Sequence, residues 1–240
     1  PALTALILLA GVVGGALPAL FAAWLHAARG VQVVISTILL NFIALALLEW
    51  AVAGPLRDPV STRPQSRPLA DAVMFLRPNP QTDFHTGIVI AFFAVAVVLV
   101  FLRYTATGFR LKWIGANPVA AHTQRIPVTR LQYTAMAWSG GLCGLAASVS
   151  FLGVARRLDA SFAENWGFLA IPVALLGGLD PIGTLASAIY FGALFAGCEA
   201  LARETSVGTS AVYVIQAVAV LVIVGLGRIR ATPAPTEEPA

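Results

Sequence analysis

The sequence predicts an all-α protein, a polytopic bundle with about seven transmembrane helices. Of its 240 residues, 58% are hydrophobic and only 11% are charged, and the mean hydropathy is +0.84. A soluble domain carries about 25% charged residues, so water cannot solvate a surface of this composition. The apolar runs also have the ~20 residues that a helix needs to cross the hydrocarbon of a bilayer. Lipid is therefore the natural solvent of this chain.

Seven apolar runs are predicted to cross the membrane, with polar connectors between them. The first two runs, 3–25 and 31–53, are separated by a short break that contains His26 and Arg29. The proline-rich stretch 54–86 follows, and it is predicted to be an extramembrane connector or a lid over a substrate path. The remaining runs are 87–102, 131–154, the short 166–176, 184–201 and 210–226.

Glycines spaced four residues apart mark two runs that other helices can approach closely. Gly11 and Gly15 lie in the first run, and Gly140 and Gly144 lie in the fourth. Such small-xxx-small pairs allow close backbone contact between membrane helices. The glycine-rich stretch 177–183 is predicted either as a turn on the cytoplasmic face or as the break of a discontinuous helix at a substrate site.

Polar side chains within the apolar runs are the candidates for a substrate path, because they usually face a bundle interior or a watery cavity. Thr37 and Asn41 share one face of the second run. For Asn41, a hydrogen bond between helices is the alternative. Glu49 and Glu199 lie near the ends of their runs, where they can reach water.

The two cysteines are predicted to be buried free thiols. Cys143 and Cys198 both lie within apolar runs, and neither takes part in a CxxC or Cys/His spacing. We therefore expect no metal site and no disulfide framework.

The segment 103–130 sets the predicted orientation, because it holds five Lys or Arg and no acidic residue. Basic residues in short loops stay cytoplasmic, so 26–30, 103–130, 177–183 and the C-terminus are placed inside. The stretches 54–86, 155–165 and 203–208 are then outside. Eight Lys or Arg and three acids lie inside, against seven and six outside.

This topology predicts one transmembrane domain over 1–230 and a disordered cytoplasmic tail over 231–240. It places the start of the chain outside. The sequence begins at Pro1, abruptly in apolar sequence, so we expect an incomplete N-terminus with further spans upstream.

Three stretches are similar to one transporter family. The segment 111–130, LKWIGANPVAAHTQRIPVTR, resembles the cytoplasmic coupling segment of permeases from bacterial ATP-binding cassette importers. The branch is the one that serves branched-chain amino acids, ribose-type sugars and nucleosides. Residues 172–183, PVALLGGLDPIG, and residues 30–48 also resemble segments of this family, in the family's order. The positions that match the coupling motif are Gly115, Asn117, Pro118, Ala120, Ala121 and Ile126.

The resemblance implies the permease subunit of an importer in the plasma (cell inner) membrane, closest to nucleoside or simple-sugar members. A branched-chain amino acid is the alternative substrate. The implied partners are ATPase subunits that bind ATP and Mg, a second permease that is identical or different, an extracytoplasmic substrate-binding lipoprotein, and lipid. This chain itself is expected to bind no cofactor.

The residues of the coupling motif also suit that role by their own chemistry. Asn117 and Pro118 fit the start of a short helix, because Asn can accept a cap bond and Pro is tolerated in the first turn. The small side chains that follow would let such a helix sit in a groove. A plain basic loop that only fixes topology is the alternative.

Other classes of protein fit the sequence less well. An ion-coupled secondary transporter would need ionisable residues deep in its spans, and only Glu49 and Glu199 lie within apolar runs. The enzyme motifs HExxH and GxSxG and the ATP-binding P-loop are absent from the sequence, so no catalytic residue is predicted. Nucleic-acid binding is not expected, because the basic residues are scattered over short loops.

Overall fold

The computed structural model describes residues 2–70, 73–77, 85–116, 126–162 and 166–204, together with positions 214, 217, 218 and 221. The chain forms two compact units, Pro1–Ala163 and Glu164–Ala240. Five described helices are long and apolar enough to cross a membrane, which confirms the predicted helical membrane bundle. They are α1 (Ala2–Arg29), α2 (Val33–Ala53), α3 (Gly87–Tyr104), α6 (Val128–Ser150) with its π-helical extension η2 (Phe151–Ala155), and α8 (Pro181–Glu204).

The count of seven crossings was approximate. The predicted short crossing at 166–176 is the 11-residue helix α7 (Trp166–Leu176), whose length at 1.5 Å per residue is only about half of the hydrocarbon thickness. The last predicted crossing, 210–226, lies largely outside the described residues.

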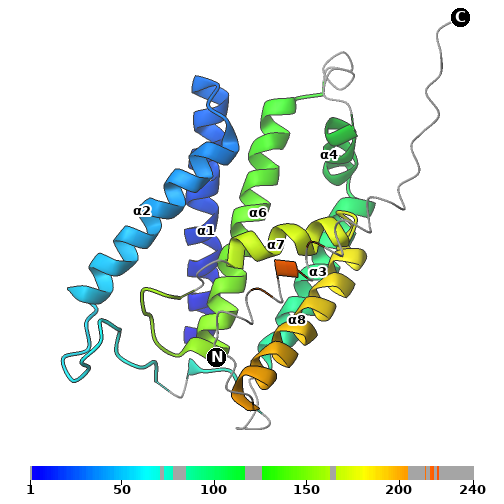
Figure 1. Ribbon diagram of the computed structural model, residues 1–240. Helices are drawn as coiled ribbons and strands as arrows, with labels where there is room; N and C mark the ends of the chain where they lie inside the picture. Colours follow the sequence, from blue (N-terminus) through cyan, green and yellow to red (C-terminus); the bar gives the residue numbers. More distant parts are fainter. Residues whose placement is uncertain are drawn as a thin grey trace, which may run out of the picture. The chain divides into compact units, whose positions relative to one another are not determined.

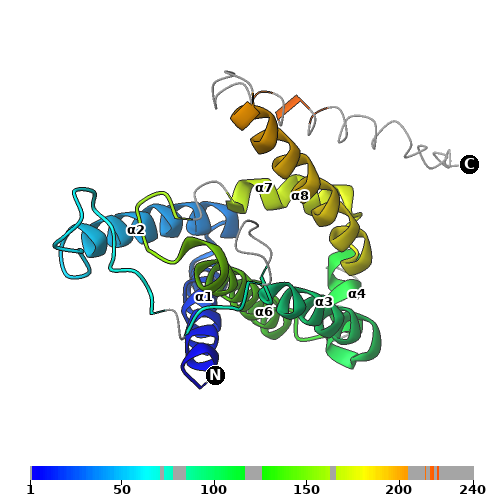
Figure 2. The same cartoon turned by 90° about the horizontal axis from the view of Figure 1, so that it is seen from below.

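Helices α1 and α6 lie side by side at the centre of the first unit (Figures 1 and 2). Their contact brings the two predicted glycine pairs against each other. A Cβ atom built on Gly11 would lie 2.8 Å from the carbonyl oxygen of Gly144, and one built on Gly15 would lie 2.8 Å from the Gly144 nitrogen. The two backbones touch because neither helix has side chains at these positions.

Helix α3 flanks α6 on the side away from α1 (Figure 2), and Phe101 stacks on Trp138 with ring centroids 4.5 Å apart. The predicted loop 103–130 begins differently in the structure. Residues Ala106–Ala116 form a helix, α4, which contacts α3 and α6. Thr105 is an extended residue between α3 and α4, and its hydroxyl accepts a hydrogen bond from the Gly108 N–H at 3.1 Å. This bond caps the start of α4, so the prediction of a loop was wrong for its first half.

Helix α2 diverges from α1 after the turn that joins them (Figure 1). Gly30 adopts a φ of 66° in that turn, and its N–H donates to the His26 carbonyl at 2.9 Å. Only Ser36 and Val52 of α2 are buried. Because α2 is apolar along its whole length and so little of it packs within this unit, lipid or another protein surface must cover it in the membrane.

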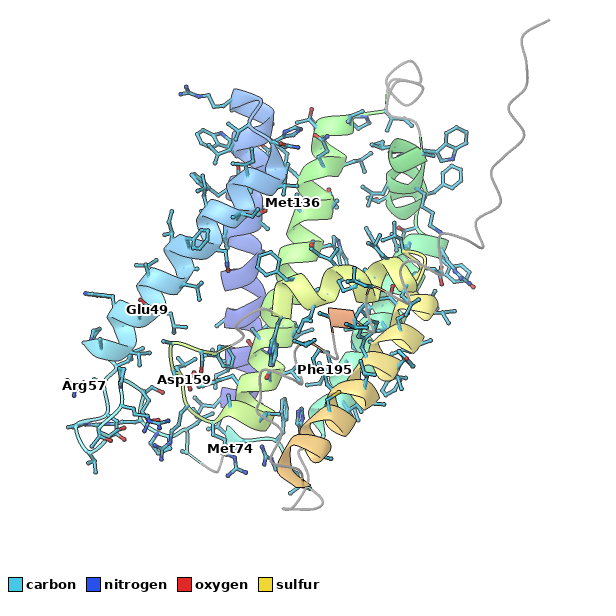
Figure 3. All side chains as sticks on the ribbon, viewed as in Figure 1. Glu49, Arg57, Met74, Met136, Asp159 and Phe195 are labelled. Carbon is cyan, nitrogen blue, oxygen red and sulfur yellow. The ribbon has the colours of Figure 1, made fainter. Side chains whose placement is uncertain are left out.

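The connector 54–77 is hydrogen-bonded to the segment that follows α6. The Ser66 N–H donates to the Leu158 carbonyl at 2.8 Å, and the Leu158 N–H donates back to the Ser66 hydroxyl at 2.9 Å. Arg77 Nε donates to the carbonyl of Gly153, in η2, at 2.9 Å. Figure 3 labels Arg57 and Asp159 on these two segments. The two connectors predicted to lie outside therefore share one end of the unit, and whether 54–86 acts as a lid stays a prediction.

The second unit is built on a helical hairpin of α7 and α8. The Leu179 N–H donates to the Ala174 carbonyl and the Gly178 N–H donates to the Leu175 carbonyl, each at 3.1 Å. This pair of bonds is the Schellman ending of a helix, which requires a left-handed residue at Gly178, where φ is 65°. Asp180 then accepts a hydrogen bond from the Ile182 N–H at 3.1 Å and caps α8.

We predict opposite effects of alanine at two glycines of this hairpin. Gly178→Ala should destabilise the protein by about 1 kcal/mol, because alanine resists the left-handed conformation. Gly192→Ala, within α8 and with open space around its Cβ position, should stabilise it by up to about 1 kcal/mol. Thermal unfolding of the two variants in detergent would measure both. Equal midpoints would contradict the proposed turn.

Candidate functional site

A cavity of about 300 Å³ lies between α1, α2 and α6 in the first unit. Asn41 is one of its lining residues and is the ninth residue of α2, roughly 12 Å along the axis from the start of the helix. At this depth the cavity lies within the membrane span. Its walls are Pro18 and Ala19 of α1; Thr37, Leu40, Asn41 and Ala44 of α2; and Met136, Ser139, Gly140 and Cys143 of α6, of which Figure 3 labels Met136.

The structure brings the two predicted path residues, Thr37 and Asn41, to this one cavity. The Thr37 hydroxyl lies 3.1 Å from the Val33 carbonyl and 3.0 Å from the Val34 carbonyl. Its single hydrogen is therefore used within α2, and only its lone pairs are available to a ligand. The Asn41 amide has no hydrogen-bond partner among the described residues. The hydrogen bond between helices that was the alternative for Asn41 is thus not found in that part of the chain.

Sequence reasoning missed the contribution of α6. Met136, Ser139, Gly140 and Cys143 follow a helical spacing of three, four and seven residues, so they share one face. Gly140 was predicted as part of a close-approach face, and its neighbours on the same helix face were the signal that could have found the others. The prediction that both cysteines are buried was wrong for Cys143, which is exposed on the face that lines the cavity, whereas Cys198 is buried.

Residues 1–227 match the family described as the branched-chain amino acid transport system permease component. The chain belongs to this family. The predicted recognition is confirmed, and the protein is a multi-pass membrane protein of a transporter family.

Three curated relatives of the permease family show which transporters the chain resembles. It is 30% identical to the "Glucose ABC transporter permease protein TsgB13" of Haloferax volcanii over 93% of this chain and 61% of the relative. It is 29% identical to the "Nucleoside ABC transporter permease protein NupB" of Lactococcus lactis over 83% of this chain and 57% of the relative. It is 28% identical to the "Guanosine ABC transporter permease protein NupP" of Bacillus subtilis over 83% and 58%.

The chain therefore spans 57–61% of the length of these curated permeases. No solved structure matches it. The family match covers both structural units, since it runs through residues 1–227.

The predicted coupling segment of the permease is described only at its two ends. Gly115 is exposed near the end of α4 with open space at its Cβ position, and Ile126 is half-buried two residues before α6. Asn117, Pro118, Ala120 and Ala121 lie outside the described residues. The coupling role of all six stays a prediction. What the structure adds is that α4 and α6, which border the segment, contact each other.

Glu49, the acidic residue predicted within the second span, does not line the cavity. Glu49 is exposed four residues before the end of α2, close to the connector that begins at Gly54 (Figure 3). The side chain of Glu199 lies outside the described part of α8. The described residues that line the cavity of the first unit are all uncharged.

Proposed function

We propose that this chain is the membrane-spanning permease subunit of an ATP-binding cassette importer that moves a nucleoside or a simple sugar. The observation that carries the proposal is the family match over residues 1–227. The printed names of relatives at 28–30% identity, which are glucose, nucleoside and guanosine permeases, support the substrate class. ATP and Mg would bind to a partner ATPase, and this chain would supply the path.

The mechanism follows from the unequal packing of the helices in the first unit. Helices α1 and α6 meet backbone to backbone through their glycines and would move as one body. Helix α2 buries few residues against the rest of the unit, so moving it breaks few contacts. A small shift of α2 against the α1–α6 pair would therefore change the cavity at a low cost in free energy. We propose that such a shift opens the path of Thr37 and Asn41 toward one side of the membrane at a time.

The force for this shift would enter through residues 103–130. This segment is the most basic in the chain, which supports a cytoplasmic position and also a cytoplasmic C-terminus. Helix α4 is part of this segment and α6 begins at its end, and α6 also forms one wall of the cavity. A push on the coupling residues would thus reach the cavity through a single rigid helix.

The proposed complex includes two ATPase subunits, a second permease that is identical or different, and an extracytoplasmic substrate-binding lipoprotein. The exposed apolar surface of α2 leaves room for another membrane partner, since Phe42 and Trp50 are 63% and 67% exposed. A branched-chain amino acid remains the alternative substrate, in keeping with the description of the family.

We predict that transport depends on ATP and on a partner ATPase. The full protein, reconstituted in vesicles with its ATPase and binding protein, should take up labelled adenosine or glucose only when ATP is supplied on the ATPase side. An ionophore that dissipates ion gradients should leave the rate unchanged. Uptake that persists without the ATPase and stops with the ionophore would instead support an ion-coupled transporter.

A further inference from the structure

We propose that the cavity between α1, α2 and α6 holds the base of a nucleoside, with the Asn41 amide hydrogen-bonded to the polar edge of that base. This inference rests on the proposed function and chooses between its two substrate classes. It starts from the chemistry of the cavity wall.

The wall of the cavity is mostly apolar. Among the described side chains that line it, only Thr37, Asn41 and Ser139 carry oxygen or nitrogen, and the others offer hydrocarbon or sulfur surface. A hexose carries hydroxyl groups around its whole ring, and each buried hydroxyl without a partner costs about 1–3 kcal/mol. A nucleobase has two apolar faces and keeps its polar atoms on its edge. Three polar groups in an apolar wall therefore match a base better than a hexose.

The hydrogen-bonding capacities of the three polar side chains also match a base. The Asn41 amide offers a donor and an acceptor side by side, which is the arrangement that pairs with adjacent acceptor and donor atoms on an adenine edge. Thr37 can only accept, because its hydrogen is used within α2. Met136 supplies a polarisable thioether, which interacts favourably with aromatic rings.

The size of the cavity agrees with a compact ring. Its volume of about 300 Å³ is at the lower end of the range for ligand pockets, roughly 300–1,000 Å³. We therefore place the base inside the cavity and the ribose toward its opening.

The native Cys143 thiol allows a direct test, because it lines the same cavity. In a Cys198→Ala background, which leaves one of the two cysteines, the assembled complex in membrane vesicles is treated with N-ethylmaleimide. Saturating adenosine should slow the alkylation of Cys143 several-fold, and glucose should not. In Asn41→Leu, half-maximal protection should need about tenfold more adenosine, because a neutral hydrogen bond contributes up to about 1.5 kcal/mol.

Two further variants complete the test. Leu39→Ala, at an exposed position of α2 that does not line the cavity, should leave protection by adenosine unchanged. Asn41→Gln, which keeps the amide, should keep protection within about threefold. The alkylation rate without any solute reports whether each variant keeps the fold around Cys143.

The outcomes separate this inference from the proposed function. Protection by glucose and not by adenosine, or protection by neither, overturns the placement of a base in the cavity. Equal protection of the wild type and Asn41→Leu overturns the role of Asn41. A wrong proposed function shows itself in a different measurement, as uptake that needs no ATP, whatever the alkylation rates are.

Discussion

Gly15→Val is expected to lower the thermal unfolding midpoint of the protein in detergent by about 10 °C, whereas Gly14→Val should change it little. The two glycines are neighbours in α1, so the substitutions alter composition and helix propensity equally. They differ in what the new side chain meets. A Cβ atom at Gly15 would lie 2.8 Å from the Gly144 nitrogen and 2.9 Å from its Cα atom, while one at Gly14 would have nothing within 4 Å.

The large effect of Gly15→Val is expected because the valine side chain would collide with backbone atoms of α6. A crowded side chain can rotate, but α6 can relieve the clash only by moving as a helix away from α1. Overpacking typically costs 1–3 kcal/mol, and the close fit on both sides of this contact places Gly15→Val at about 3 kcal/mol. In a chain of this size that corresponds to roughly 6–12 °C. The same contact from the other helix, where a Cβ at Gly140 would lie 2.5 Å from the Ala19 Cβ, should be equally intolerant.

The measurement is the unfolding midpoint of the two purified variants beside the wild type, with the fraction that elutes as a single species as a second readout. A Gly15→Val protein with the midpoint of Gly14→Val would contradict the contact between α1 and α6. Equal losses in both variants would show that valine in α1, rather than the contact, is the cause.

This contact also shows how far the sequence could predict the fold. Apolar length located the long helices, with ends that differ from the structure by up to four residues. The four-residue spacing identified Gly11 and Gly15 and, separately, Gly140 and Gly144 as close-approach faces. It could not tell that the two pairs meet each other, because a small-residue stripe makes room for a neighbour without specifying which helix fills it.

Helix α4 was missed because the prediction followed hydropathy. Residues 106–116 are too polar for a span and lie in the most basic part of the chain, so they were assigned to a loop. Thr105 was the available signal, since threonine before a run of helix-forming residues is typical of an N-cap.

The predicted site was half complete for a similar reason. Asn41 could be recognised from the sequence because a polar side chain within an apolar span carries a free-energy cost. Met136 and Cys143 are common in apolar spans, and only the helix face that they share connects them with the cavity.

In the assembled complex, Ala121→Arg is expected to abolish the stimulation of the partner ATPase by this chain. Membrane insertion of the chain should be unchanged. Ala121 lies outside the described residues, so the expectation rests on the match of 115–126 to the coupling motif and on the proposed docking of this segment in a groove of the ATPase. A groove that fits alanine has no space for a guanidinium group, and a charge forced into it would also lose its water. Losing a side-chain contact at the centre of a protein interface costs about 2 kcal/mol or more of binding free energy. The ATPase would then bind this segment about 30-fold more weakly.

The matched control for Ala121→Arg places the same charge in the connector that begins at Gly54. Val60 is 90% exposed in the connector that is hydrogen-bonded to the segment after α6, so Val60→Arg should insert, assemble and stimulate ATPase activity as the wild type does. The comparison is made at equal permease content, with ATP hydrolysis measured as the concentration of the partner ATPase is raised. Stimulation of Ala121→Arg at the wild-type concentration would mean that residues 117–125 are a basic loop that fixes topology and that the force enters elsewhere. Recovery only at a much higher ATPase concentration would instead place the contact at Ala121, because a weakened interface is restored by mass action and a lost conformational step is not.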